Sequence, residues 1–161
     1  MEIAKVTRNE AEILKNLMSL YLHDMSEYAD FLRLSIDGSY KYQNLGYYLA
    51  KDELSAFFIK IDSEIAGFIL SNRPPYIPDD CDISIQEFFI LKKYRKKGFG
   101  SQVASTFFKK FPGKYFVAQL IGNKPAIEFW RSVYRQLKLE FEEREEINSG
   151  VKVLTQRFTI S

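Results

Sequence analysis

The sequence predicts an α/β protein of the α+β kind, with a mixed, mostly antiparallel sheet of six to seven strands flanked by about four helices. Three observations predict it. Short β-rich runs recur along the 161 residues, apolar residues at helical spacing fill segments between them, and a short polar turn joins two of the runs as a hairpin. A chain of this length is in the size range of one domain, so we expect a single domain over residues 1–161.

The first third of the chain predicts one strand and one long helix. Residues 3–6 form a short β-rich run, and Asn9 followed by Glu12 has the spacing of a capping box that starts a helix. Apolar residues then recur at helical spacing through about Asp24, which gives the helix one apolar face. Residues 26–51 combine many aromatic residues with two glycines, and we expect short helices and loops that cover a cleft.

A hairpin and a proline-rich loop follow. Residues 56–61 and 65–71 are β-rich, and the polar residues 62–64 between them suit a hairpin turn. Gly67 interrupts the second run and indicates a bulge. Residues 73–80 contain three prolines and are expected to form a loop.

The rest of the chain alternates strands with helices. Residues 82–91 predict a strand and residues 100–111 a helix, with a basic, glycine-containing turn between them. Residues 115–120 predict a buried strand. A second helix is expected to start at Asn123, because the proline two residues later suits a first helical turn. Two final strands are expected at residues 138–142 and 151–159.

Composition disfavours several classes of protein. Hydrophobic residues (46%) and charged residues (27%) are close to the average for soluble proteins, whereas 16% aromatic residues is high and favours an aromatic core or an aromatic-lined cleft. Cys81 and His23 are the only cysteine and histidine, which rules out a disulfide within the chain and metal sites built from these ligands, so we expect no metal. The net charge of +2 disfavours a nucleic-acid binder.

Hydropathy gives no sign of a membrane protein. The longest apolar runs are far shorter than the roughly 20 residues that span a bilayer. The amino terminus lacks the basic patch and apolar stretch of a secretory signal. We therefore expect a cytoplasmic protein with no membrane partner.

The turn from Arg95 to Gly100, Arg-Lys-Lys-Gly-Phe-Gly, is the segment best suited to bind a ligand. Its glycines let backbone N–H groups approach phosphates closely, and the helix that follows offers its unpaired N–H groups and the positive end of its dipole. The arginine and lysines add positive charge. The alternative is a solvated basic turn that ends a strand.

This turn resembles the phosphate-binding turn of the GNAT superfamily of N-acetyltransferases, which has Gln or Arg, two variable residues, Gly, one variable residue, then Gly or Ala. Arg95, Gly98 and Gly100 match that pattern, and residues 87–91 resemble the strand that precedes it in polyamine acetyltransferases. The family's next helix usually has Asn, two residues, Ala, then an aromatic pair, matched by Asn123, Ala126, Phe129 and Trp130. The resemblance covers about residues 54–135 and implies a GNAT-like three-layer fold.

The resemblance also implies acetyl-coenzyme A (acetyl-CoA) as cosubstrate and an amine as acceptor. The main chain of Phe89, Ile90 and Leu91 would bond the acetyl carbonyl and the pantetheine arm, and Asn123 would bond that arm or cap its helix. The implied cofactor-binding residues are Phe89, Ile90, Leu91, Arg95, Lys96, Lys97, Gly98, Phe99, Gly100, Ser101, Asn123, Ala126 and Trp130.

Two residues are candidates for catalysis. Glu87 alternates with Phe88 along the strand, so it can face the acceptor cleft and act as general base; the alternative is a carboxylate paired with a Lys or Arg. Polyamine acetyltransferases have their proposed base one position earlier, where this chain has Gln86. In the family, a tyrosine that protonates the departing thiolate usually occupies the position of Trp130. Tyr134, one turn later, would be the general acid here or a core residue.

The sequence thus predicts transfer of an acetyl group from acetyl-CoA to a primary amine of a small molecule or peptide. Two alternatives belong to other classes. One is a catalytically weak CoA-binding domain that acts as a sensor or interaction module, and the other is nucleic-acid binding through residues 92–97. The edge of strand 151–159 would allow a homodimer or could be solvated.

Overall fold

The computed structural model describes all residues from 1 to 161 and contains one seven-stranded sheet in the order β1-β2-β3-β4-β5-β7-β6. Only β4 and β5 are parallel neighbours, so the mixed, mostly antiparallel sheet that the sequence predicts is confirmed. The strands are β1 (Glu2–Lys5), β2 (Leu54–Ile61), β3 (Glu64–Asn72), β4 (Ile83–Ile90), β5 (Gly113–Leu120), β6 (Phe141–Asn148) and β7 (Val151–Ile160).

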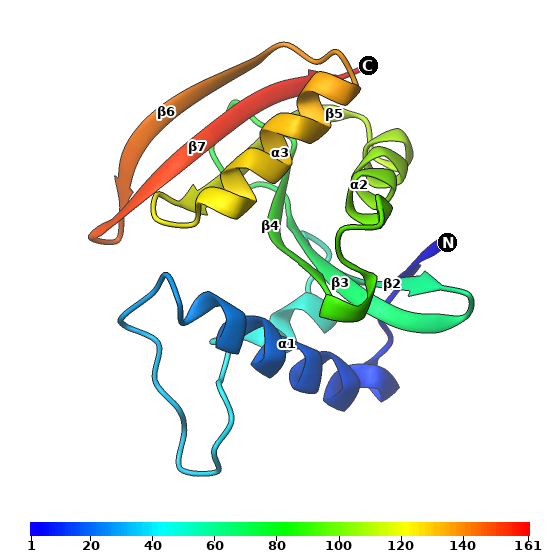
Figure 1. Ribbon diagram of the computed structural model, residues 1–161, viewed down its shortest axis with the longest axis vertical. Helices are drawn as coiled ribbons and strands as arrows, with labels where there is room; N and C mark the ends of the chain where they lie inside the picture. Colours follow the sequence, from blue (N-terminus) through cyan, green and yellow to red (C-terminus); the bar gives the residue numbers. More distant parts are fainter.

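Helices cover both faces of this sheet, with α1 on one side and α2 and α3 on the other (Figure 1). Three α-helices are present where the sequence predicts about four helices in all, and three short 3-10 helices accompany them. None of the helices is long and apolar enough to cross a membrane. The helices are η1 (Arg8–Glu10), α1 (Ala11–Met25), η2 (Leu45–Leu49), η3 (Lys92–Tyr94), α2 (Phe99–Lys110) and α3 (Lys124–Gln136).

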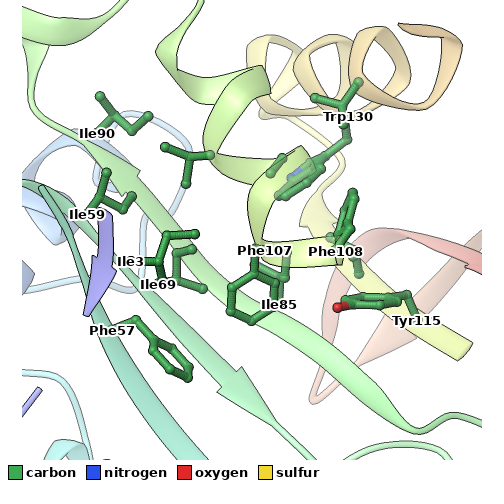
Figure 2. Packing of buried hydrophobic residues seen from close by; sticks show 14 of the residues in the cluster. Ile3, Phe57, Ile59, Ile69, Ile85, Ile90, Phe107, Phe108, Tyr115 and Trp130 are labelled. Carbon is green, nitrogen blue, oxygen red and sulfur yellow. The ribbon is translucent and has the colours of Figure 1, made fainter. Parts of the chain in front are cut away.

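Two apolar clusters hold the three layers together. The larger one fills the space between the sheet and α2 and α3, and Figure 2 shows Phe107, Phe108, Tyr115 and Trp130 gathered there. The smaller one lies between the sheet and α1. Many of the aromatic residues lie in these clusters, where ring pairs such as Phe108 and Tyr115, with centroids 4.9 Å apart, pack a helix against the sheet.

The start of α1 differs from the prediction. The capping box is formed by Thr7 and Glu10, not by Asn9 and Glu12: the Thr7 backbone N–H donates to Glu10 Oε2 at 2.9 Å. This box closes the single 3-10 turn η1, which then continues into α1. Threonine followed three residues later by glutamate was the stronger capping signal in the sequence.

The hairpin of β2 and β3 is confirmed, with Asp62 and Ser63 at positive φ in its turn. The bulge predicted at Gly67 lies one residue earlier, because Ala66 has no partner between the pairs that Gly67 and Ile65 make with β2. Gly67 has a different role. A Cβ there would lie 1.9 Å from the Phe89 carbonyl oxygen, so only glycine lets β3 approach β4 at this point.

The last hairpin is longer than predicted. The expected strand at 138–142 is instead β6, which runs to Asn148, and the turn consists of Ser149 and Gly150 at positive φ. The glutamates of β6 obscured the strand in the sequence, because acidic residues are rare in strands. β6 is an edge strand whose side chains are mostly exposed, and charges are tolerated there.

Candidate functional site

Strands β4 and β5 separate halfway along their length. They pair only over residues 83–85 and 115–117, while β4 stays paired with β3 up to Ile90 and β5 with β7 up to Leu120. The carboxyl-terminal halves of β4 and β5 therefore lack each other as partners. A ligand can take the place of the missing strand in such a gap.

The backbone groups that face this gap come from alternate residues of β4. The N–H of Leu91 donates to Ala66 O at 2.8 Å and its carbonyl accepts from the Tyr94 N–H, so both groups are used, and Phe89 two residues earlier directs its backbone groups to β3. Phe88 and Ile90 direct theirs to the gap. Of the three residues predicted to bind acetyl and pantetheine through the main chain, the structure therefore orients only Ile90 suitably, and Phe88 joins it.

A cavity of about 500 Å³ opens at the separation of the strands. On one side it is bounded by α1 and the segment 29–43, and on the other by β5, the start of α3 and the last hairpin. The lining residues are Tyr21, Leu22, Met25, Ala29, Phe31, Leu32, Lys41, Tyr42, Gln43, Ile85, Gln86, Glu87, Phe88, Val117, Ala118, Gln119, Leu120, Asn123, Ala126, Trp130, Asn148 and Val153.

Glu87 carries the only carboxylate in this lining. Its carboxylate accepts hydrogen bonds from the hydroxyls of Tyr21, on α1, and of Tyr42, the latter at 3.0 Å. Burial raises the pKa of Glu87 to about 7, while the hydrogen bonds from the two tyrosines and Gln86 act in the opposite direction. Glu87 makes no ion pair, so the alternative prediction of a carboxylate paired with Lys or Arg is wrong.

A bulge in β4 brings Gln86 and Glu87 to the cavity together. The pairing of β4 with β3 skips Gln86, which has no partner strand residue. The Gln86 side chain accepts from Asn72 Nδ2 at 3.1 Å, and Tyr48 donates to Asn72 Oδ1 at 2.8 Å. The sequence analysis did not identify Tyr21, Tyr42, Tyr48 or Asn72 as residues of the site. The only signals were the aromatic richness of residues 26–51 and Tyr21 on the apolar face of α1.

Arg95 joins the basic turn to the rest of the molecule. Its Nε donates to Ile90 O at 2.6 Å and its Nη2 to Asp24 Oδ2 at 2.5 Å. Lys92 approaches the same Asp24 carboxylate at 3.4 Å. Arg95 thus ties the end of β4 to the end of α1, which gives it a structural role beside the predicted contact with a cofactor.

The start of α2 has the features of a phosphate site. Gly98 caps the helix with φ +80°, and no side chain bonds the first N–H groups, those of Phe99, Gly100 and Ser101. Lys96 and Lys97 are exposed beside them. Uncapped N–H groups next to two lysines can bind a phosphate group.

Gly100, by contrast, is required for packing. A Cβ at this position would lie 2.8 Å from the ring of Phe129 on α3. The second glycine of the motif therefore lets α2 and α3 approach each other. The two glycines of the pattern therefore meet different requirements: Gly98 adopts a positive φ at the helix start, and Gly100 leaves room for close helix packing.

The start of α3 closes the cavity on the side of β5. The Asn123 side chain accepts from the Ala126 N–H at 3.1 Å, so it caps the helix, and Asn123 Nδ2 lies 3.6 Å from Met25 Sδ. Asn123, Ala126 and Trp130 all line the cavity, and the Trp130 ring packs against Phe88 with centroids 5.3 Å apart.

Tyr134 is not brought to the cavity. It is fully buried, its hydroxyl donates to Gln156 Oε1 at 3.0 Å, and burial raises its pKa well above the usual value. The centroids of the Tyr134 and Phe158 rings lie 4.5 Å apart. This environment favours the alternative role predicted for Tyr134, that of a core residue.

Comparison with known proteins points to one family. The profile described as "Acetyltransferase (GNAT) family" matches residues 15–133. No curated protein sequence is significantly similar to the chain.

Solved structures share the fold at low sequence identity. An acetyltransferase from Thermus thermophilus has a TM-score of 0.68 at 15% identity, over 97% of this chain and 94% of that one. A structure of histone acetyltransferase HPA2 and related acetyltransferase from Corynebacterium glutamicum has a TM-score of 0.70 at 11% identity, over 99% and 96%. The aminoglycoside acetyltransferase AAC(6')-Ib in complex with coenzyme A has a TM-score of 0.67 at 13% identity, over 98% and 95%.

Proposed function

The chain belongs to the GNAT acetyltransferase family, and from this premise we propose that it transfers the acetyl group of acetyl-CoA to a primary amine, with Glu87 as general base. The observation that carries the proposal is the Glu87 carboxylate, which lies at the cavity wall where β4 and β5 separate. The similar aminoglycoside acetyltransferase supports an amine acceptor.

The cofactor would lie across the separated strands. The N–H groups at the start of α2, with Lys96 and Lys97, would bind the phosphates. The backbone groups of Phe88 and the N–H of Ile90, whose carbonyl accepts from Arg95, would replace strand pairing with bonds to the pantetheine arm, and Asn123, Ala126 and Trp130 would border it. Bound there, acetyl-CoA supplies an activated acetyl thioester.

Glu87 would prepare the acceptor. An alkylammonium has a pKa of about 10.4, so at neutral pH a base must remove a proton before the nitrogen can attack. A carboxylate with a pKa of about 7 is far better suited to accept that proton than one of ordinary acidity. Tyr21 and Tyr42 hold the carboxylate in place.

One further group completes the chemistry. A free backbone N–H of β4 that faces the gap would stabilise negative charge on the carbonyl oxygen as the nitrogen attacks. The bond between the carbonyl carbon and sulfur then breaks, and the sulfur leaves as a thiolate that takes up the second proton lost by the nitrogen; no tyrosine acid is assigned, because Tyr134 lies outside the cavity. A thiol of pKa about 8.5 is a good leaving group at neutral pH.

The test is amine-dependent release of free thiol from acetyl-CoA by the purified protein, with the acetylated amine identified by mass spectrometry. We expect release to require both an amine and Glu87. Tight binding of acetyl-CoA without thiol release for any amine would instead support the alternative of a CoA-binding module.

A further inference from the structure

The lining of the cavity is mostly apolar. Fifteen of the 22 lining residues are hydrophobic. α1 and the segment after it contribute four apolar side chains to the lining that contains Glu87, those of Leu22, Met25, Phe31 and Leu32. An acceptor whose nitrogen reaches Glu87 has these apolar side chains to pack against.

The cavity offers one negative charge and no second one. Glu87 is its only carboxylate, and Lys41, its only cationic side chain, is paired with Asp37. The nearest acidic group of α1, Asp24, is occupied by Arg95 and Lys92 and does not line the cavity. A second ammonium group on the acceptor would lose its water without gaining a carboxylate to pair with, since amide oxygens of the lining, such as the unpartnered one of Gln119, offer only a neutral hydrogen bond.

The volume also limits the acceptor. About 500 Å³ is in the lower half of the range for small-molecule pockets, and the cavity extends from Tyr21 and Glu87 to Asn123 and Trp130 on the cofactor side. The acetyl end of the cofactor would occupy part of it. The remaining space suits a compact molecule.

Given the proposed function, on which this inference rests, we propose that the acceptor is a small primary amine with a single amino group on an apolar aliphatic or aromatic body. Its nitrogen lies at Glu87 and its body against Met25, Phe31 and Leu32. Polycationic amines, such as polyamines and aminoglycosides, are poor acceptors.

The test compares amines that differ in their number of amino groups. Thiol release from acetyl-CoA is measured with n-hexylamine and with 1,6-diaminohexane, which have the same chain length, and with 2-phenylethylamine and spermidine. We expect kcat/KM for n-hexylamine and 2-phenylethylamine to exceed that for the diamine and spermidine by about tenfold or more, the selectivity that 1.4 kcal/mol provides. Equal or faster acetylation of the polycations, or acetylation only of a lysine-containing peptide, overturns this inference while leaving the proposed function intact. No turnover with any amine overturns both.

A pair of variants tests the wall directly. Leu32→Glu adds a carboxylate to the apolar side of the cavity, and Leu32→Gln is nearly the same size without the charge. We expect Leu32→Glu to raise kcat/KM for 1,6-diaminohexane relative to n-hexylamine, and Leu32→Gln to leave that ratio near the wild-type value. Phe31→Glu, at a side chain that is 61% exposed, repeats the test where the fold tolerates a charge. An unchanged ratio in both glutamate variants contradicts the placement of the acceptor.

Discussion

At the scale of single residues, Glu87 combines two opposing influences. Burial at the cavity wall destabilises its charge, and the hydroxyls of Tyr21 and Tyr42 stabilise it. The resulting pKa of about 7 keeps the carboxylate ionised in part of the population at neutral pH while making it basic enough to accept a proton.

Replacing Glu87 by Gln should reduce turnover near pH 7 by on the order of 100-fold or more, because general bases contribute at least that much. Cofactor affinity should change little. In the wild type, activity should rise as pH increases through about 7, where Glu87 loses its proton. High pH should partly rescue the variant, since the amine then deprotonates unaided. Initial rates across pH 6–10, with calorimetric titration of acetyl-CoA, check this, and an identical pH profile in the variant would assign Glu87 a bystander role.

The same variant should alter stability in a pH-dependent way. The pKa of Glu87 is raised in the folded protein, so its favourable contribution is complete below about 4.5 and is lost as pH rises through about 7. Glu87→Gln should therefore be more stable than the wild type at pH 8, by up to about 3 kcal/mol, and gain nothing at pH 4. Urea denaturation at the two pH values measures the difference. A pH-independent difference would mean that Glu87 ionises normally.

Tyr42→Phe should shift the acidic limb of the rate profile to higher pH, by up to about one unit, because it removes a hydrogen bond that lowers the pKa of Glu87. Tyr40→Phe is the matched control, since Tyr40 lies on the same segment and does not line the cavity. The pH dependence of kcat/KM distinguishes the two variants. If they shift the profile equally, Tyr42 does not tune Glu87.

At the scale of elements, the turn before α2 and the approach of β3 to β4 both depend on glycine, for different reasons. Gly98 supplies a left-handed conformation with open space around it: the nearest atom to an added Cβ is Gln102 Nε2 at 4.0 Å. Gly67 is needed because it has no side chain: the Phe89 backbone occupies the volume that a Cβ would fill. A side chain at Gly98 therefore meets no obstacle, and its charge can be changed to test the helix end as a phosphate site.

Gly98→Asp should weaken acetyl-CoA binding by about 100-fold or more, because it places a negative charge at the helix end that would bind phosphates. Gly98→Asn is the matched control, since Asn and Asp tolerate positive φ similarly and differ in charge. It should retain most of the affinity. Calorimetric titration of both variants, after circular dichroism confirms their folding, gives the comparison. Wild-type affinity in the Asp variant would show that the phosphates bind elsewhere.

At the scale of the whole molecule, the separation of β4 and β5 divides the sheet into two parts, each with its own partner strands and helices. The parts remain joined by the short pairing at residues 83–85 and by the contact of Asn123, at the start of α3, with Met25 on α1. A cofactor bound between them would contact both parts. Binding should therefore stabilise the entire fold.

Acetyl-CoA at 100 times its dissociation constant should stabilise the protein by about 2.7 kcal/mol, which corresponds to a rise in Tm of about 5–10 °C for a chain of this size. Differential scanning fluorimetry measures the shift, and adenosine, which lacks the phosphates, should give little. A folded protein whose Tm does not respond to millimolar acetyl-CoA would remove the basis for the proposed function.

The sequence by itself determined most of the elements and the turn at residues 95–100, because helical spacing, turn residues and the pattern of Arg95, Gly98 and Gly100 are local properties of the chain. It could also place Glu87 on a strand beside that turn. Only the tertiary structure decided which side chains meet there. Tyr42 reaches Glu87 across 45 positions of sequence, the bulge at Gln86 sets which side chains face the cavity, and Gln156 holds the Tyr134 hydroxyl in the core. These outcomes depend on strand pairing and packing between distant segments, and local patterns carry no information about such contacts.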